Sequence, residues 1–167
     1  AHPGLASAAG IERGERLQAA LYGIADLASS GLGMEDMLRR IHLVVGELMY
    51  ARNFYIALYD GQRDSVRFIY FADAKDTNAY EANREVPAAS LRDSLTLGLI
   101  RHGSPVRGPA HQVASVLQVP SGIGLGTPAL DFLGVPIVDD SGVRGAVVVQ
   151  TYEAGVHYSA EDSALLA

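Results

Sequence analysis

The sequence predicts an α+β domain with a central antiparallel sheet, N- and C-terminal helices on one face, and loops and short helices over the other. Three observations predict it. Apolar residues recur every three or four positions after about Met34, as in an amphipathic helix. From Phe54 the apolar period changes to two, the repeat of a strand. Near the C-terminus, the runs 133–138 and 143–149 flank a tight turn, which joins antiparallel neighbours.

Composition limits the number of domains and the classes of function. The 167 residues suit a single domain, which we place at 12–167, with the Ala/Gly-rich residues 1–11 as a linker or a remnant of cloning. The net charge of −6 and a single lysine, Lys75, argue against nucleic acid. Cysteine is absent, which excludes disulfides, thiol nucleophiles and Cys-ligated metals and fits a cytoplasmic location. No apolar run is long enough for a membrane span, and we expect no membrane contact.

Two helices are expected before the first strand. Residues 12–29 carry apolar side chains at helical spacing, and 29–33 break that pattern. A parallel dimer seam would use Leu17, Leu21, Ile24 and Ala28. The second helix, from about Met34, has its apolar stripe at Met37, Leu38, Ile41, Val44, Val45, Leu48 and Met49. His42 lies off this stripe, and we expect it to be solvated.

The first strand is expected to present two different faces. Phe54, Ile56 and Leu58 form an apolar face that suits packing on the helix stripe. The opposite face offers two tyrosines around a small residue: Tyr55, Ala57 and Tyr59. The polar segment 60–64 turns the chain into a second strand, 65–72.

The middle of the chain is expected to cover the second face of the sheet. Residues 73–93 are polar and suggest a mobile excursion with a short strand near 84–86. Ser94, with Asp93 before it, can cap a helix through Arg101 that Gly103 closes. A short extended piece at 105–109, a helix at 110–117 and a Gly-rich segment at 121–126 follow.

The C-terminal part contains the strongest strand signal. The segment 139–142 is acidic and ends in glycine, as a turn requires. The β-branched run 147–149 is typical of a strand covered on both faces. Ser159 with Asp162 resembles a capping box that opens a final helix. The chain stops at Ala167 inside that helix, so we expect the domain to be cut from a longer protein.

These segments together resemble a GAF domain, a profilin-like sensory module of bacterial signalling proteins. The resemblance rests on LGVPI, a turn, GAVVVQ and a capped helix, and on NFYIALYD and VRFIYF in the first half. It covers about residues 15–167. It implies a three-layer fold, a small-molecule ligand in the covered face and signalling through the terminal helices. It also implies a homodimer through those helices and a linked output domain such as a histidine kinase, diguanylate cyclase (GGDEF) or phosphodiesterase (EAL). A PAS domain is the alternative, but two helices before the first strand favour GAF.

The candidate ligand-binding residues are Tyr55, Ala57, Tyr59, Thr127 and Gln150. Aromatic rings with hydroxyls around a small residue suit a mostly apolar pocket with a few polar groups. Gln150 ends the run of valines and, if buried, needs hydrogen-bond partners. The alternative is that both tyrosines pack under the middle segment, and that Gln150 lies at the solvated end of its strand.

No cofactor or catalytic group is indicated. The glycines of 122–126 lack the preceding strand and following helix of a phosphate loop. The five histidines form no metal-binding pair, and no G-x-S-x-G elbow occurs. The Asn-Lys pair of cyclic-nucleotide GAF domains is missing, as are the cysteines of bilin-binding and methionine-sulfoxide-reducing relatives. Two hypotheses remain: a regulatory domain that senses a small molecule, and a ligand-free dimerisation module. An empty, polar-rimmed cavity would favour the first, and large side chains meeting across the interior would favour the second.

Overall fold

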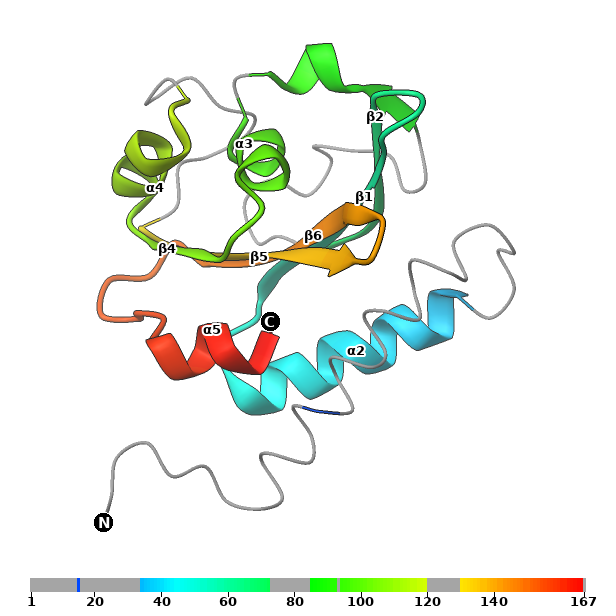
Figure 1. Ribbon diagram of the computed structural model, residues 1–167. Coiled ribbons are helices and arrows are strands. Elements are labelled where there is room, and N and C mark those ends of the chain that lie inside the picture. The colour runs from blue at the N-terminus through cyan, green and yellow to red at the C-terminus, as the bar shows by residue number, and fades with distance from the viewer. Residues whose placement is uncertain (1–14, 16–33, 73–84, 93, 120–129, 167) are drawn as a thin grey trace.

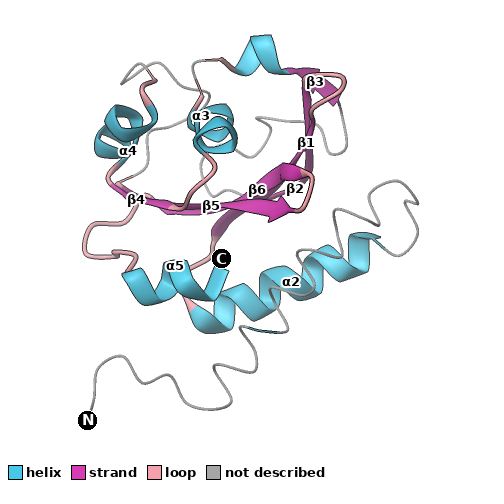
Figure 2. Ribbon diagram, in the orientation of Figure 1, coloured by secondary structure: helices cyan, strands magenta, loops and turns pink. Residues whose placement is uncertain are grey.

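The computed structural model describes residue 15 and residues 34–72, 85–92, 94–119 and 130–166. The described residues from 34 onward contain one sheet that lies between two layers of helices (Figure 1). The elements are α2 (Met34–Leu48), β1 (Asn53–Asp60), β2 (Ser65–Ala72), β3 (Glu85–Pro87), the 3₁₀ helix η1 (Ala88–Leu91), α3 (Leu95–His102), β4 (Val106–Gly108), α4 (Ala110–Leu117), β5 (Asp131–Asp139), β6 (Gly142–Thr151) and α5 (Ala160–Leu166). In Figure 2, α2 and α5 lie on one side of the strands, and η1, α3 and α4 lie on the other. The predicted α+β layering is confirmed.

The six described strands form one antiparallel sheet in the order β3-β2-β1-β6-β5-β4. The two tight hairpins, β1–β2 and β5–β6, lie side by side because β1 pairs with β6 from Asn53↔Gln150 to Leu58↔Gly145. Both edge strands have three residues each, which leaves little exposed backbone for pairing with other chains. The expected strand at 84–86 is found one residue later, as β3.

β1 separates two cores, as its alternation predicts. Phe54 and Ile56 belong to the core under α2 and α5, and this side of the sheet is called the helix face. Tyr55 and Ala57 belong to the core under η1, α3 and α4, which is called the cover face. Val147, Val148 and Val149 of β6 are fully buried because successive valines enter the two cores in turn.

α2 packs on the helix face through the predicted stripe, with Leu38, Ile41 and Val45 buried. The prediction for His42 was wrong. His42 is half-buried: its Nδ1 lies 2.6 Å from the Tyr70 hydroxyl and its Nε2 lies 2.5 Å from the Ala51 carbonyl oxygen. Since a carbonyl only accepts, Nε2 donates to Ala51, and the ring ties α2 to β2 and to the segment before β1.

The predicted helix ends of α3 and α5 are confirmed. The Ser94 hydroxyl accepts from the Leu97 amide at 3.2 Å, and α3 closes at Gly103, whose φ of +74° suits glycine. At α5, the Ser159 hydroxyl accepts from the Asp162 amide, and the Asp162 carboxylate accepts from the Ser159 amide. This reciprocal pair is a capping box.

Several expectations fall outside the described residues. The helix at 12–29, with the seam residues Leu17, Leu21, Ile24 and Ala28, lies there except for position 15, and so does most of the excursion at 73–93. Thr127 and the Gly-rich segment also lie outside. The 3₁₀ helix η1, at the end of the excursion, was not foreseen.

Candidate functional site

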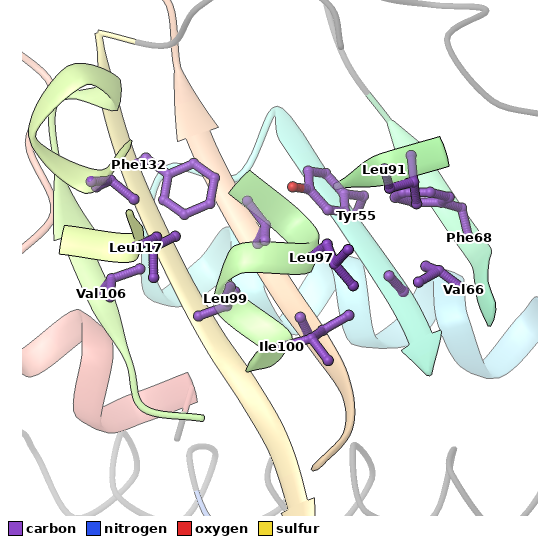
Figure 3. Packing of buried hydrophobic residues seen from close by; sticks show 14 of the residues in the cluster. Tyr55, Val66, Phe68, Leu91, Leu97, Leu99, Ile100, Val106, Leu117 and Phe132 are labelled. Atoms are coloured by element: carbon purple, nitrogen blue, oxygen red, sulfur yellow. The ribbon is translucent and has the colours of Figure 1, made fainter. Parts of the chain in front are cut away.

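The cover face is where the sequence resemblance implies a ligand pocket, and its described residues form a packed apolar core. In Figure 3, Tyr55, Phe68 and Leu91 meet on one side of α3, and Val106, Leu117 and Phe132 meet on the other. Leu97 and Leu99 of α3 fill the space between them and are fully buried. Large side chains therefore meet across this interior.

Tyr55 is the central predicted residue, and it is 7% exposed. Its ring stacks on Phe71 with centroids 5.6 Å apart, and its hydroxyl lies 2.7 Å from the Thr96 hydroxyl in α3. This hydrogen bond joins β1 to α3 within the core. The neighbouring Ala57 has no exposed surface.

Two glycines that sequence reasoning did not single out determine how closely α3 packs against α4 and against the sheet. A methyl group at Gly98 of α3 would lie 3.1 Å from the Leu117 Cβ, so glycine allows α3 and α4 to pack closely. A methyl group at Gly134 of β5 would lie 2.6 Å from a Leu99 methyl carbon, so glycine also admits α3 to the sheet. Isolated glycines within an apolar helix and an apolar strand are the signal that could have found them.

Gln150 lies at the end of β6 where β1 begins. Its side chain is half-buried, and its Nε2 donates to the Tyr152 hydroxyl at 3.3 Å. Its backbone carbonyl accepts from the Asn53 side-chain amide at 3.1 Å. Gln150 is thus tied to its own strand end.

Tyr59 lies at the opposite end of β1 and lines a cleft of about 560 Å³ between the β1–β2 and β5–β6 turns. This hairpin cleft is lined by Leu58, Tyr59, Asp60, Gly61, Gln62, Ser65, Arg67, Glu85, Ser141, Val143 and Arg144. Tyr55 and Gln150 do not line it. The described members of the predicted ligand set therefore do not converge on one cleft.

Two titratable groups of the cleft, Tyr59 and Glu85, are held by hydrogen bonds from or to neighbouring side chains. The Tyr59 hydroxyl donates to Asp64 at 2.7 Å, and this bond raises the pKa of Tyr59 above its ordinary value. The Glu85 carboxylate accepts from the Ser65 hydroxyl at 2.6 Å and from Arg63 at 3.1 Å. The Ser65 bond is the main cause of a lowered pKa of Glu85, with the charges of Arg63 and Arg67 adding to it.

A separate group of contacts links β4 and β5 to the start of α5. The Asp131 carboxylate of β5 accepts from the Tyr158 amide at 2.7 Å, and Arg107 of β4 donates to the Tyr158 carbonyl at 3.3 Å. The Tyr158 hydroxyl donates to the Tyr50 carbonyl oxygen, between α2 and β1, at 2.8 Å. Burial raises the pKa of Tyr158. We call these contacts the Tyr158 junction.

The described residues contain no group of three or more His, Asp or Glu side chains placed to hold a metal ion. None of the helices described is both long and apolar enough to span a membrane.

Comparisons with known proteins identify the fold. No family model matches the chain, and no curated protein matches it either. Among solved structures, the chain is similar to the GAF domain of an Acinetobacter phosphoenolpyruvate-protein phosphotransferase, with 17% identity, a TM-score of 0.63 and coverage of 96% of this chain and 87% of that one. The GAF domain of the corresponding Coxiella burnetii protein gives 15% identity, a TM-score of 0.56 and coverage of 91% and 86%.

An enzyme is also among the similar structures. Free methionine-R-sulfoxide reductase from Neisseria meningitidis, solved with its substrate, gives 16% identity, a TM-score of 0.56 and coverage of 99% and 87%. Identities this low speak for fold alone. The chain has the fold of GAF domains, as its sequence pattern predicted.

Proposed function

We propose that this GAF-fold chain is a regulatory domain of a bacterial, cytoplasmic signalling protein, that it senses a small molecule, and that its terminal helices pass the signal to a linked output domain. The supporting observation is that different elements cover the two faces of the sheet. α2 and α5 cover one face, and a separate layer covers the other. The GAF domains with similar structures come from multidomain signalling proteins, including a sensor histidine kinase.

The Tyr158 junction offers a route from β4 and β5 to the start of α5. Asp131 and Arg107 hold the two backbone polar groups of Tyr158, two residues before α5 begins. A ligand that moves β4 or β5 would displace these partners and shift the start of α5. Such a change needs only that the ligand bind one arrangement more tightly than the other.

For the ligand site we propose the cover face, with Tyr55, Ala57, Tyr59, Thr127 and Gln150 as the first residues to test. Because the described part of this face is packed, a ligand there requires side chains to move apart. The Tyr55–Thr96 hydrogen bond would open first, since it joins polar side-chain atoms of β1 and α3 across the layer that must separate.

A second candidate function is favoured by that same packing. A filled interior is what a ligand-free dimerisation module would have, with a seam at Leu17, Leu21, Ile24 and Ala28. The two functions predict different species in solution. They also predict different responses to substitution of Leu17 and Leu21.

Native mass spectrometry under gentle conditions tests both. A dimer with extra mass that disappears on denaturation supports sensing of a non-covalent ligand. A dimer without extra mass that becomes monomeric in L17E/L21E supports the dimerisation module. A monomer with no extra mass, and no thermal shift with a panel of metabolites, would contradict both.

A further inference from the structure

The hairpin cleft exists because two neighbouring strands stop pairing before they end. β1 and β6 pair as far as Leu58↔Gly145, but β1 continues to Asp60 and β6 begins at Gly142. The two hairpin tips therefore separate. Hydrogen bonds hold each turn: Asp60 accepts from the backbone amides of Gln62 and Arg63, and Asp139 accepts from that of Ser141. The cleft therefore lies between two turns that are each held by an aspartate.

Two guanidinium groups supply hydrogen-bond donors to this cleft. Arg144 lines the cleft, and Asp139 accepts from its guanidinium at 2.7 Å, which holds the guanidinium at the cleft. Within the described ranges, the Arg67 guanidinium has no hydrogen-bond or ion-pair partner, although its charge helps to lower the pKa of Glu85. Arg67 is half-buried in the lining.

The acidic groups of the cleft are already engaged. Glu85 accepts from Ser65 and Arg63, and one Asp60 oxygen accepts from two backbone amides. The formal charges of the lining residues cancel, because two are acidic and two are basic: Asp60, Glu85, Arg67 and Arg144. Recognition would therefore come from directed guanidinium donors rather than from net charge. Guanidinium groups pair best with planar or tetrahedral oxyanions.

We propose that the hairpin cleft binds a small polar metabolite through a phosphate or carboxylate group held by Arg67 and Arg144. Hydroxyls of such a ligand would meet Ser141 and Gln62, which also line the cleft. The volume of about 560 Å³ suits a small molecule. This site lies at the hairpin tips, beside the packed core of the cover face, and it shares Tyr59 with the ligand set proposed there.

The test is a titration of ¹⁵N-labelled protein with inorganic phosphate and, separately, with citrate, at an ionic strength held constant with chloride. We expect saturable amide shifts at Gln62 and Ser141, with a dissociation constant on the order of 1 mM for at least one of the two anions. The stronger anion identifies the group as phosphate or carboxylate. Shifts that stay linear up to roughly 50 mM for both anions would overturn the proposal.

Substitutions distinguish a site from general charge screening. R67Q should weaken binding at least about tenfold, since it removes the guanidinium donors. R67K keeps the charge and the aliphatic stem, and it should also bind more weakly because it lacks the planar fork; it serves if R67Q does not fold. The matched control is R52Q, which removes an exposed guanidinium paired only with Glu153 among the described residues, at the other end of β1. Equal weakening by R67Q and R52Q would refute a specific site.

Discussion

Tyr55 and Tyr59 lie four residues apart on the same side of β1, yet one is buried and the other lines an open cleft. Tyr55 is buried in the cover face, and its hydroxyl bonds Thr96, 41 residues away. Tyr59 lines the open hairpin cleft, and its hydroxyl bonds Asp64, five residues away in its own hairpin. The strand period places both rings on one face, but depth in the fold depends on what else covers that face.

The two regions also differ in the interactions that stabilise them. The cover face depends on close apolar packing, with glycines at its tightest contacts. The hairpin cleft depends on turn hydrogen bonds and ion pairs at the surface. Substitutions should therefore cost far more stability in the cover face and at the cleft's base than at its rim. Four predictions test this difference, from the largest expected effect to the smallest.

The largest effect is expected at Gly145, where the cleft meets the paired part of the sheet. A side chain there would overlap the carbonyl oxygen of Ala57 and contact the backbone of Leu58. Backbone cannot move aside as a flexible side chain can, so G145V should separate β1 from β6 and leave little folded protein. Circular dichroism and thermal melting measure this.

The control is a glycine without such neighbours. At Gly46 of α2, nothing lies within 4 Å of the position that an added methyl group would take. Because alanine favours a helix interior over glycine, G46A should gain up to about 1 kcal/mol in free energy of unfolding. A G145V protein as stable as wild type would show that the close β1–β6 contact at Gly145 is not required for folding.

Phe132 should give the next largest effect. It is 1% exposed in the cover face. F132A removes a ring that its neighbours cannot replace, and it should lower the free energy of unfolding by about 3–5 kcal/mol. Urea denaturation measures the loss. V138A, at a side chain 39% exposed in the same strand, is the control and should cost less than about 1 kcal/mol.

The hydroxyl of Tyr55 gives the third effect. Y55F leaves the buried Thr96 hydroxyl without this partner and should cost about 1–3 kcal/mol. Y59F removes a bond at the cleft rim and should cost no more than about 0.5 kcal/mol. The double variant Y55F/T96V should recover part of the loss because both polar partners are gone. Equal costs for Y55F and Y59F would contradict the contrast between the two regions.

The sequence predicted the elements well because their signals are local. The alternation in 54–59 and the Ser94 cap depend on neighbours a few positions away, and both were found where expected. His42 was misjudged because its partner, Tyr70, is 28 residues away on another strand. Helical spacing alone shows only that His42 is off the stripe.

The candidate sites were harder to predict. The hairpin cleft depends on where β1–β6 pairing stops, and the residue pattern of either strand does not contain that register. The two arginines of the cleft are 77 positions apart and come from different hairpins. Packing in the cover face depends on Gly98 and Gly134, whose role appears only when α3 is placed on the sheet.

The smallest effect is expected at the cleft rim, in the acid range. The pKa of Glu85 is lowered, chiefly by the Ser65 hydroxyl. A lowered folded-state pKa stabilises the fold above the unfolded-state pKa, and that contribution is lost as the pH falls through the folded-state pKa. Since Glu85 is exposed, the change in stability should be slight. S65A should raise the pKa of Glu85 toward its ordinary value in a carboxyl-carbon NMR titration. S90A removes a nearby hydroxyl that donates to the Pro87 carbonyl, and it should leave that pKa unchanged. If S65A left the titration of Glu85 as it is in the wild type, the fields of Arg63 and Arg67 would be the main cause, and the cleft would present a stronger positive field than its hydrogen bonds indicate.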